Sequence, residues 1–407
     1  FYQMVRRLEE SGELSKETVF IDGTKLEACA NKYTFVWKKS VGKWEAKMFQ
    51  KVQEAVSLLN QEYLCQFCVG EETRTRDLKE ICRFLDEKCK VDGTVFVHGR
   101  GKRKSRNQRY QELFRRFLER QTIYDWHTAS FQGRNNYCKT DPDATFMHMK
   151  DDHMRNAQLK PGYNVQIAVD SEYIVATEIF QDRNDVWTLV PFLKDMETKL
   201  GFRYPSVTAD SGYESEEAYE YLRKAGQKAY IKPQSYEKWK KRSFKKDISK
   251  RENMGYDEET DTYTCHAGKK LEAVSVRKQK SKSGYQAEVT VYEGEDCSGC
   301  PYKEKCTKAK GNKRLYLSKN FLKKRQESYE NIRSEKGILY RMNRSIQVEG
   351  AFGVLKNDYG FQRFLLRGKT KVKLEILLLC LGYNLNKLHA KIQNGRTGSH
   401  LFEVKSA

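Results

Sequence analysis

The sequence predicts a mixed α/β protein with a central sheet flanked by helices. Short apolar runs at 18–21 and 206–209 have the length and composition of buried strands. Two further runs, 162–170 and 173–181, alternate between apolar and polar residues and are separated by a two-residue turn, as in a β-hairpin. Because helical stretches lie between these strands, we expect a sheet covered by helices.

The elements follow in a definite order. After the first strand, the region 41–125 is charged and helical, and its best stretch repeats apolar residues every three or four positions. Beyond the hairpin, the sequence predicts a helix over 186–200, a strand at 206–209, a helix over 214–226 and a strand at 228–233. We expect five segments: the start of the core (1–40), a helical insertion (41–140), the main core (141–233), a basic cysteine-bearing insertion (234–330) and closing helices (331–407).

The composition indicates a polyanionic partner. The 407-residue chain has 76 Lys and Arg against 55 Asp and Glu, a net charge of +21. Nucleic acid is the favoured partner, because each neutralised phosphate releases condensed counterions. The longest apolar run, 374–383, is too short to span a bilayer, so we expect no membrane association. With no secretory signal visible, we expect a cytoplasmic protein whose eleven cysteines are reduced thiols or metal ligands.

Three acidic residues stand out. Asp22 and Asp210 each end a predicted strand and are followed closely by glycine, although Asp-Gly is also a common turn dipeptide. Glu349 lies on a predicted late helix, and Lys356 follows seven residues later, so a regular helix places the two on one face. Converging carboxylates repel one another unless a cation is bound, and the pattern favours Mg²⁺.

At these residues the chain resembles a known family. The segments "FIDGTKLEA", "VTADSGYES" and "VEGAFGVLKNDYG" are similar to the three acidic motifs of DDE-type bacterial insertion-sequence transposases. The resemblance covers nearly the whole chain and extends to the branch with a cysteine-bearing insertion before the catalytic Glu. It implies a ribonuclease-H-like core in which Asp22, Asp210 and Glu349 are catalytic and hold Mg²⁺ or Mn²⁺.

The resemblance also implies an activity and partners. The protein would cut DNA at the ends of an insertion sequence and transfer the strands into target DNA, as a homodimer that holds both ends. Lys356 would contact phosphate near the cut, and Tyr340 and Arg344, which precede the Glu, would also contact DNA. Two alternatives remain: a non-catalytic or truncated transposase-derived DNA-binding protein, since the chain opens on Phe1 without the usual N-terminal region, and a ribonuclease-H-fold nuclease.

Further basic and aromatic residues are candidate DNA contacts. Arg363 and Arg367 in "GFQRFLLRG" suit backbone phosphates, with solvated charge as the alternative. Trp239, in the basic run "EKWKKRSFKK", would stack on an unpaired base, or else anchor the segment as a partly buried side chain. Asp182 and Asp185, after the hairpin, are interpreted as a helix N-cap and its neighbour.

Two cysteine groups raise the question of zinc. Cys265 and the "DCSGCPYKEKC" cysteines Cys297, Cys300 and Cys306 form a plausible four-thiolate structural site in a polar insertion. The second group begins with another C-x2-C pair, Cys65 and Cys68, and continues with Cys82 and Cys89. Its sequence reads as helical, so core packing on a helix is favoured there over zinc.

Overall fold

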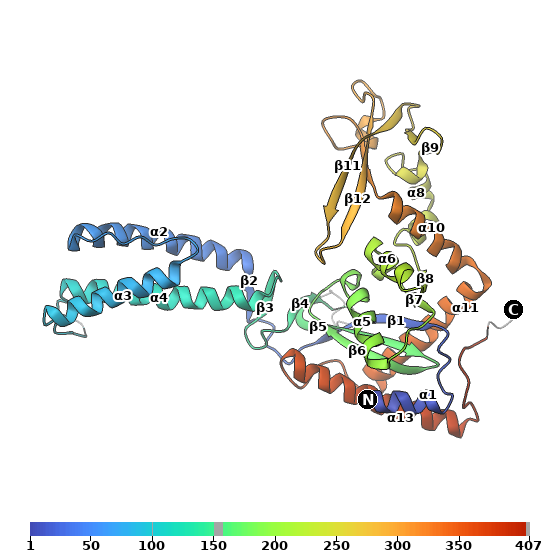
Figure 1. Cartoon of the computed structure of the whole chain (residues 1–407), viewed down its shortest axis with the longest axis horizontal. Coiled ribbons are helices and arrows are strands. Elements are labelled where there is room, and N and C mark those ends of the chain that lie inside the picture. Colours follow the sequence, from blue (N-terminus) through green and yellow to red (C-terminus); the bar gives the residue numbers. More distant parts are fainter. Residues whose placement is uncertain (100, 150–157, 404–407) are drawn as a thin grey trace. The chain divides into compact units, whose positions relative to one another are not determined.

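The structure is a computed structural model and describes residues 1–99, 101–149 and 158–403. The chain divides into two compact units (Figure 1). The first contains Phe1–Leu26, Tyr163–Phe364 and Thr370–Ala407, and the second contains Glu27–Gly162 and Leu365–Lys369. Over the described ranges, no helix is both long and apolar enough to cross a bilayer.

The first unit is built on a mixed sheet, which confirms the predicted α/β class. Its strands are ordered β6-β5-β1-β7-β8, with β1 parallel to β7, β7 parallel to β8, and β5 antiparallel to β6. These strands are β1 (Val19–Glu27), β5 (Leu159–Asp170), β6 (Tyr173–Phe180), β7 (Ser206–Ala209) and β8 (Lys228–Ile231). The predicted hairpin is confirmed: Ser171 and Glu172, both with positive φ, form the two-residue turn between β5 and β6.

Helices cover both faces of this sheet. Because side chains alternate along a strand, Val19 and Ile21 pack with α1, α5 and α6 in one apolar cluster, while Phe20 points the other way and contacts Tyr340 of α11. The longer helices of the first unit and the short α12 are α1 (Tyr2–Glu10), α5 (Leu189–Leu200), α6 (Glu216–Lys224), α10 (Lys319–Arg333), α11 (Glu335–Arg344), α12 (Gly350–Gly353) and α13 (Lys369–Gln393).

The basic cysteine-bearing segment forms its own antiparallel sheet. The strand order is β13-β12-β11-β10-β9, and the long β11–β12 hairpin dominates it (Figure 1). The elements are α7 (Tyr236–Trp239), α8 (Arg242–Lys245), β9 (Gly255–Asp257), β10 (Thr262–Thr264), β11 (Lys270–Lys280), β12 (Gln286–Gly294), α9 (Lys303–Cys306) and β13 (Arg314–Leu317). Only five buried apolar residues form the core of this sheet.

The second unit is mainly helical. Its helices α2, α3 and α4 pack around a core that includes Leu59, Ile81 and Phe114. Its elements are β2 (Phe35–Trp37), α2 (Lys38–Tyr63), α3 (Arg74–Val91), α4 (Arg106–Phe131), β3 (Asn136–Cys138) and β4 (Thr145–His148), which pairs with Leu159–Gly162.

Candidate functional site

Two of the three predicted acids lie side by side on neighbouring strands. In the parallel pair of β1 and β7, Ile21 is opposite Ala209, and Asp22 and Asp210 are the next residues along the two segments. The backbone N–H of Gly23 donates to Asp22 Oδ1 (2.8 Å), and that of Gly212 donates to Asp210 Oδ1 (2.7 Å). Each carboxylate is therefore held by the local backbone at the same edge of the sheet.

The prediction that Asp22 ends its strand is wrong. β1 continues to Glu27, because its other side is bordered by β5 after the ladder with β7 has stopped. Gly23 makes no left-handed turn. A Cβ at this position would lie 2.2 Å from Nε2 of Gln166, so glycine is required by the close approach of β5.

Arg344 joins Asp22 to the third acid. Its Nη1 is 3.0 Å from Asp22 Oδ2, and its Nη2 is 2.9 Å from Glu349 Oε1. The Arg344 side chain is only 16% exposed, so this contact is shielded from solvent on the arginine side. Asp210 and Arg344 line one pocket together with Lys232 and Arg341. Arg344 thus pairs with two of the three predicted acids, and the third lines the same pocket as Arg344.

The segment carrying Glu349 is not a regular α-helix. Ser345–Glu349 and Val354–Asp358 are π-helical turns on either side of α12. The predicted shared face of Glu349 and Lys356 assumed regular α-helical spacing, and the wider π turns change that spacing, so this argument is wrong. π turns are frequent at functional sites, and the sequence pattern gave no signal of them.

A buried polar network supports the two aspartates. The Tyr213 hydroxyl donates to Oε1 of Gln166, whose Nε2 donates to Asn164 Oδ1 (2.9 Å) and Asp185 Oδ1 (3.0 Å). Burial raises the pKa of Tyr213 well above its usual value, and the charges of Asp185, Asp22 and Asp210 raise it further. Tyr213 therefore stays protonated and donates its hydrogen bond beneath the acids.

Asp185 is a site residue that the sequence reasoning missed. The interpretation of Asp185 as part of a helix cap is wrong, since α5 begins after Thr188 and the Asp185 carboxylate accepts from Asn164 and Gln166. The available signal was two amide residues at alternate positions of an otherwise apolar strand. Such residues need buried polar partners.

The acids fit a divalent cation chemically. Carboxylate oxygens are the ligands that Mg²⁺ prefers, and Asp22 and Glu349 already share one positive group. In the part of the chain that the structure describes, no three His, Cys, Asp or Glu side chains stand at metal-ligand spacing. Arg344 is the cation that pairs with Asp22 and Glu349 in this arrangement.

The other predicted DNA contacts differ in accessibility. Tyr340 is fully buried and packs edge-on against Phe20 and Tyr230, so its prediction as a DNA contact is not compatible with this arrangement. Trp239 is half-buried and packs edge-on against Tyr329, which fits the anchor alternative. The remaining positions are Lys356, which is half-buried, and Arg363, which is exposed.

Arg367 belongs to the second unit. Its Nε donates to the carbonyl of Cys29 at 2.7 Å, while the residue as a whole is exposed. The guanidinium therefore has a backbone partner and still has exposed surface.

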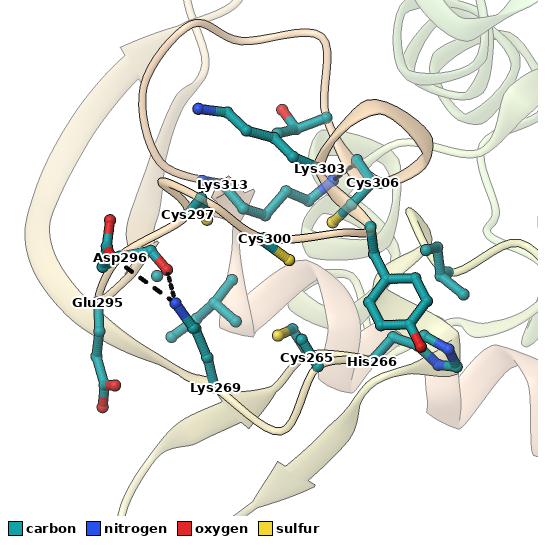
Figure 2. A pocket seen from close by; sticks show the side chains of 16 residues that line it. Cys265, His266, Lys269, Glu295, Asp296, Cys297, Cys300, Lys303, Cys306 and Lys313 are labelled. Atoms are coloured by element: carbon teal, nitrogen blue, oxygen red, sulfur yellow. Dashed lines mark hydrogen bonds and ion pairs between the residues drawn. The ribbon is translucent and has the colours of Figure 1, made fainter.

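The two cysteine groups differ in their surroundings. Cys82 and Cys89 are buried in α3, and burial raises the pKa of the Cys82 thiol to about 11, so these are core thiols. Cys65 and Cys68 follow α2 in a loop, so the helical interpretation is wrong for them. The other group, Cys265, Cys297, Cys300 and Cys306, lines a single pocket (Figure 2).

The site thus consists of acids at adjacent positions of two parallel strands and a third acid in a later helical segment. Residues 264–389 match a family model described as "Transposase DDE domain". The match includes Glu349, Lys356 and the four pocket cysteines, and it supports a relation to DDE-type transposases. Comparisons with curated proteins and with solved structures gave no match.

Proposed function

We propose that this protein is a DNA transposase that cleaves strands at the ends of an insertion sequence and transfers them into target DNA. The observation that carries the proposal is that Asp22 and Glu349 pair with Arg344, whose pocket Asp210 also lines. The family match supports the same class of activity.

We propose that the core is ribonuclease-H-like. The sheet order β6-β5-β1-β7-β8, with an antiparallel hairpin at one side and parallel strands at the other, supports this assignment. Asp22 and Asp210 stand where the parallel pairing of β1 with β7 stops, the end at which open α/β sheets place their sites.

The proposed roles follow from the positions of the side chains. Asp22, Asp210 and Glu349 would hold Mg²⁺ or Mn²⁺, which supplies Lewis-acid activation of water or a DNA 3′-hydroxyl. Asp22 and Asp210 are oriented by backbone N–H groups, and the Tyr213–Gln166–Asp185 network holds the strands beneath them. Arg344 keeps the acids together before DNA arrives and is well placed to contact a phosphate near the cut.

The proposed partners are DNA and a second copy of the chain. Lys356, Arg363 and Arg367 are proposed phosphate contacts, and the net charge of +21 supports a polyanionic substrate. Homodimer formation would allow two ends to be cut and joined together.

The test is an end-cleavage assay. The protein is incubated with DNA carrying the candidate terminal inverted repeats, with Mg²⁺ or Mn²⁺, and Asp210→Ala is compared with Asp195→Ala as the matched aspartate control. We expect metal-dependent cuts at the repeats that Asp210→Ala abolishes and Asp195→Ala retains, followed by joining to target DNA. Binding without cleavage would instead establish the non-catalytic DNA-binding alternative, and cleavage without joining would establish the nuclease.

A further inference from the structure

The four cysteines of the small sheet come from separate positions in its topology. Cys265 directly follows β10, Cys297 and Cys300 follow β12, and Cys306 ends α9. All four line one pocket, and Cys265, Cys300 and Cys306 point into it (Figure 2). The fold therefore brings together thiols that are 41 residues apart at the extremes, 306 − 265.

The local backbone is shaped to present these sulfurs. Ser298 donates its N–H to Asp296 Oδ1 (2.8 Å), and Gly299 has a φ of +64°, so the chain turns tightly between Cys297 and Cys300. The backbone N–H of Lys313 lies 3.3 Å from Cys297 Sγ and donates to it. Hydrogen bonds of this kind orient the ligands of metal sites.

The charges that line the pocket suit an anionic thiolate cluster. Four thiolates around Zn²⁺ carry a net charge of −2, and Lys303 and Lys313 line the same pocket. The two ammonium groups therefore offset the negative charge that four thiolates leave around the ion.

From this cluster we infer that Cys265, Cys297, Cys300 and Cys306 bind one structural Zn²⁺ that fixes the base of the β11–β12 hairpin. Binding converts four thiols and Zn²⁺ into a tetrathiolate and four released protons. Because no three such side chains in the described residues stand at ligand spacing, the cysteine side chains rotate toward the ion when it binds.

The position of the ion gives it a mechanical role. The ligands flank β11 and β12, whose small sheet has only five buried apolar residues and needs a further constraint. At the other end of this hairpin, Lys282 pairs with Asp182, and the Tyr285 hydroxyl donates to Glu216 at 3.2 Å. A fixed base therefore holds the hairpin against the core that carries the proposed catalytic acids.

The experiment measures the zinc content of the purified full chain. We expect about one zinc per chain in the wild type and a loss of zinc in Cys297→Ser/Cys300→Ser. The matched control, Cys65→Ser/Cys68→Ser, removes a second C-x2-C pair from the other unit and should retain the zinc. Cobalt substitution should give the strong visible bands of tetrahedral thiolate coordination in the wild type and the control alone.

A second measurement keeps the inference testable if the double variant misfolds. Wild-type protein treated with a zinc chelator should become sensitive to protease within 255–317, while the remainder of the first unit stays resistant. A wild type without bound metal, or zinc retained after removal of Cys297 and Cys300, would overturn the inference. Neither measurement uses DNA, so its failure is separate from failure of the proposed transposase activity.

Discussion

Gly23→Ala tests whether the close contact between β1 and β5 supports the site. The added Cβ would lie 2.2 Å from Gln166 Nε2 and 2.9 Å from its Cδ, so the fully buried Gln166 side chain must move. Overpacking costs about 1–3 kcal/mol, and each buried hydrogen bond that is lost to Asn164, Asp185 or Tyr213 adds about 1 kcal/mol or more. We expect Gly23→Ala to lower the free energy of unfolding by about 3 kcal/mol.

The assay is thermal unfolding combined with DNA cleavage. A loss of about 3 kcal/mol corresponds to a decrease in Tm of roughly 6–12 °C for a unit of this size. The matched control is Gly382→Ala, where an added Cβ meets nothing within 4 Å in α13, and the expected change is neutral or stabilising by up to about 1 kcal/mol.

A double mutant separates the clash from the loss of glycine itself. Gln166→Ala removes the side chain that Gly23→Ala would strike, so the double variant should lose little more stability than Gln166→Ala alone. An unchanged Tm and full cleavage in Gly23→Ala would refute the reasoning, as would simple additivity of the two substitutions.

Three further predictions concern charge. Arg344→Ala removes the cation shared by Asp22 and Glu349, so DNA-free protein should bind Mn²⁺ about tenfold more tightly in calorimetry, the equivalent of one charge-assisted hydrogen bond. Arg341→Ala should leave the Mn²⁺ affinity unchanged, and weaker Mn²⁺ binding by Arg344→Ala would contradict this prediction. Lys391→Met leaves the buried Glu13 carboxylate without its ion-pair partner, so the free energy of unfolding in chemical denaturation should fall by about 3–5 kcal/mol, against about 1 kcal/mol or less for an exposed pair. An unchanged free energy of unfolding would count against the pairing. DNA affinity should fall at least about 10³-fold between 50 and 200 mM salt in a filter-binding assay, and a flat response would exclude extensive phosphate contact.

The sequence predicted the fold class correctly but not the local geometry around the acids. Alternation at 162–170 and the two-residue turn predicted the β5–β6 hairpin correctly, because periodicity directly reports a half-buried strand. The continuation of β1 past Asp22 depends on pairing with β5, a distant segment, and local turn propensity cannot report it.

The remaining differences also have non-local causes. The contact of Arg344 with both Asp22 and Glu349 joins residues more than 300 positions apart in one case, and no spacing rule encodes it. The π turns around α12 depend on hydrogen-bond register, which residue types specify weakly. Asp185 resembled an ordinary helix cap because its amide partners, Asn164 and Gln166, lie on β5 and not in its own segment.

The most direct test of the central claim is the number of Mn²⁺ ions bound in the protein–DNA complex, measured by electron paramagnetic resonance of the free ion. If Asp22, Asp210 and Glu349 hold the catalytic metals, the wild-type complex should bind about two ions per site. Asp210→Asn should lose at least one of them, and Asp195→Asn should bind as the wild type does. Equal Mn²⁺ binding by the wild type and Asp210→Asn would contradict the account.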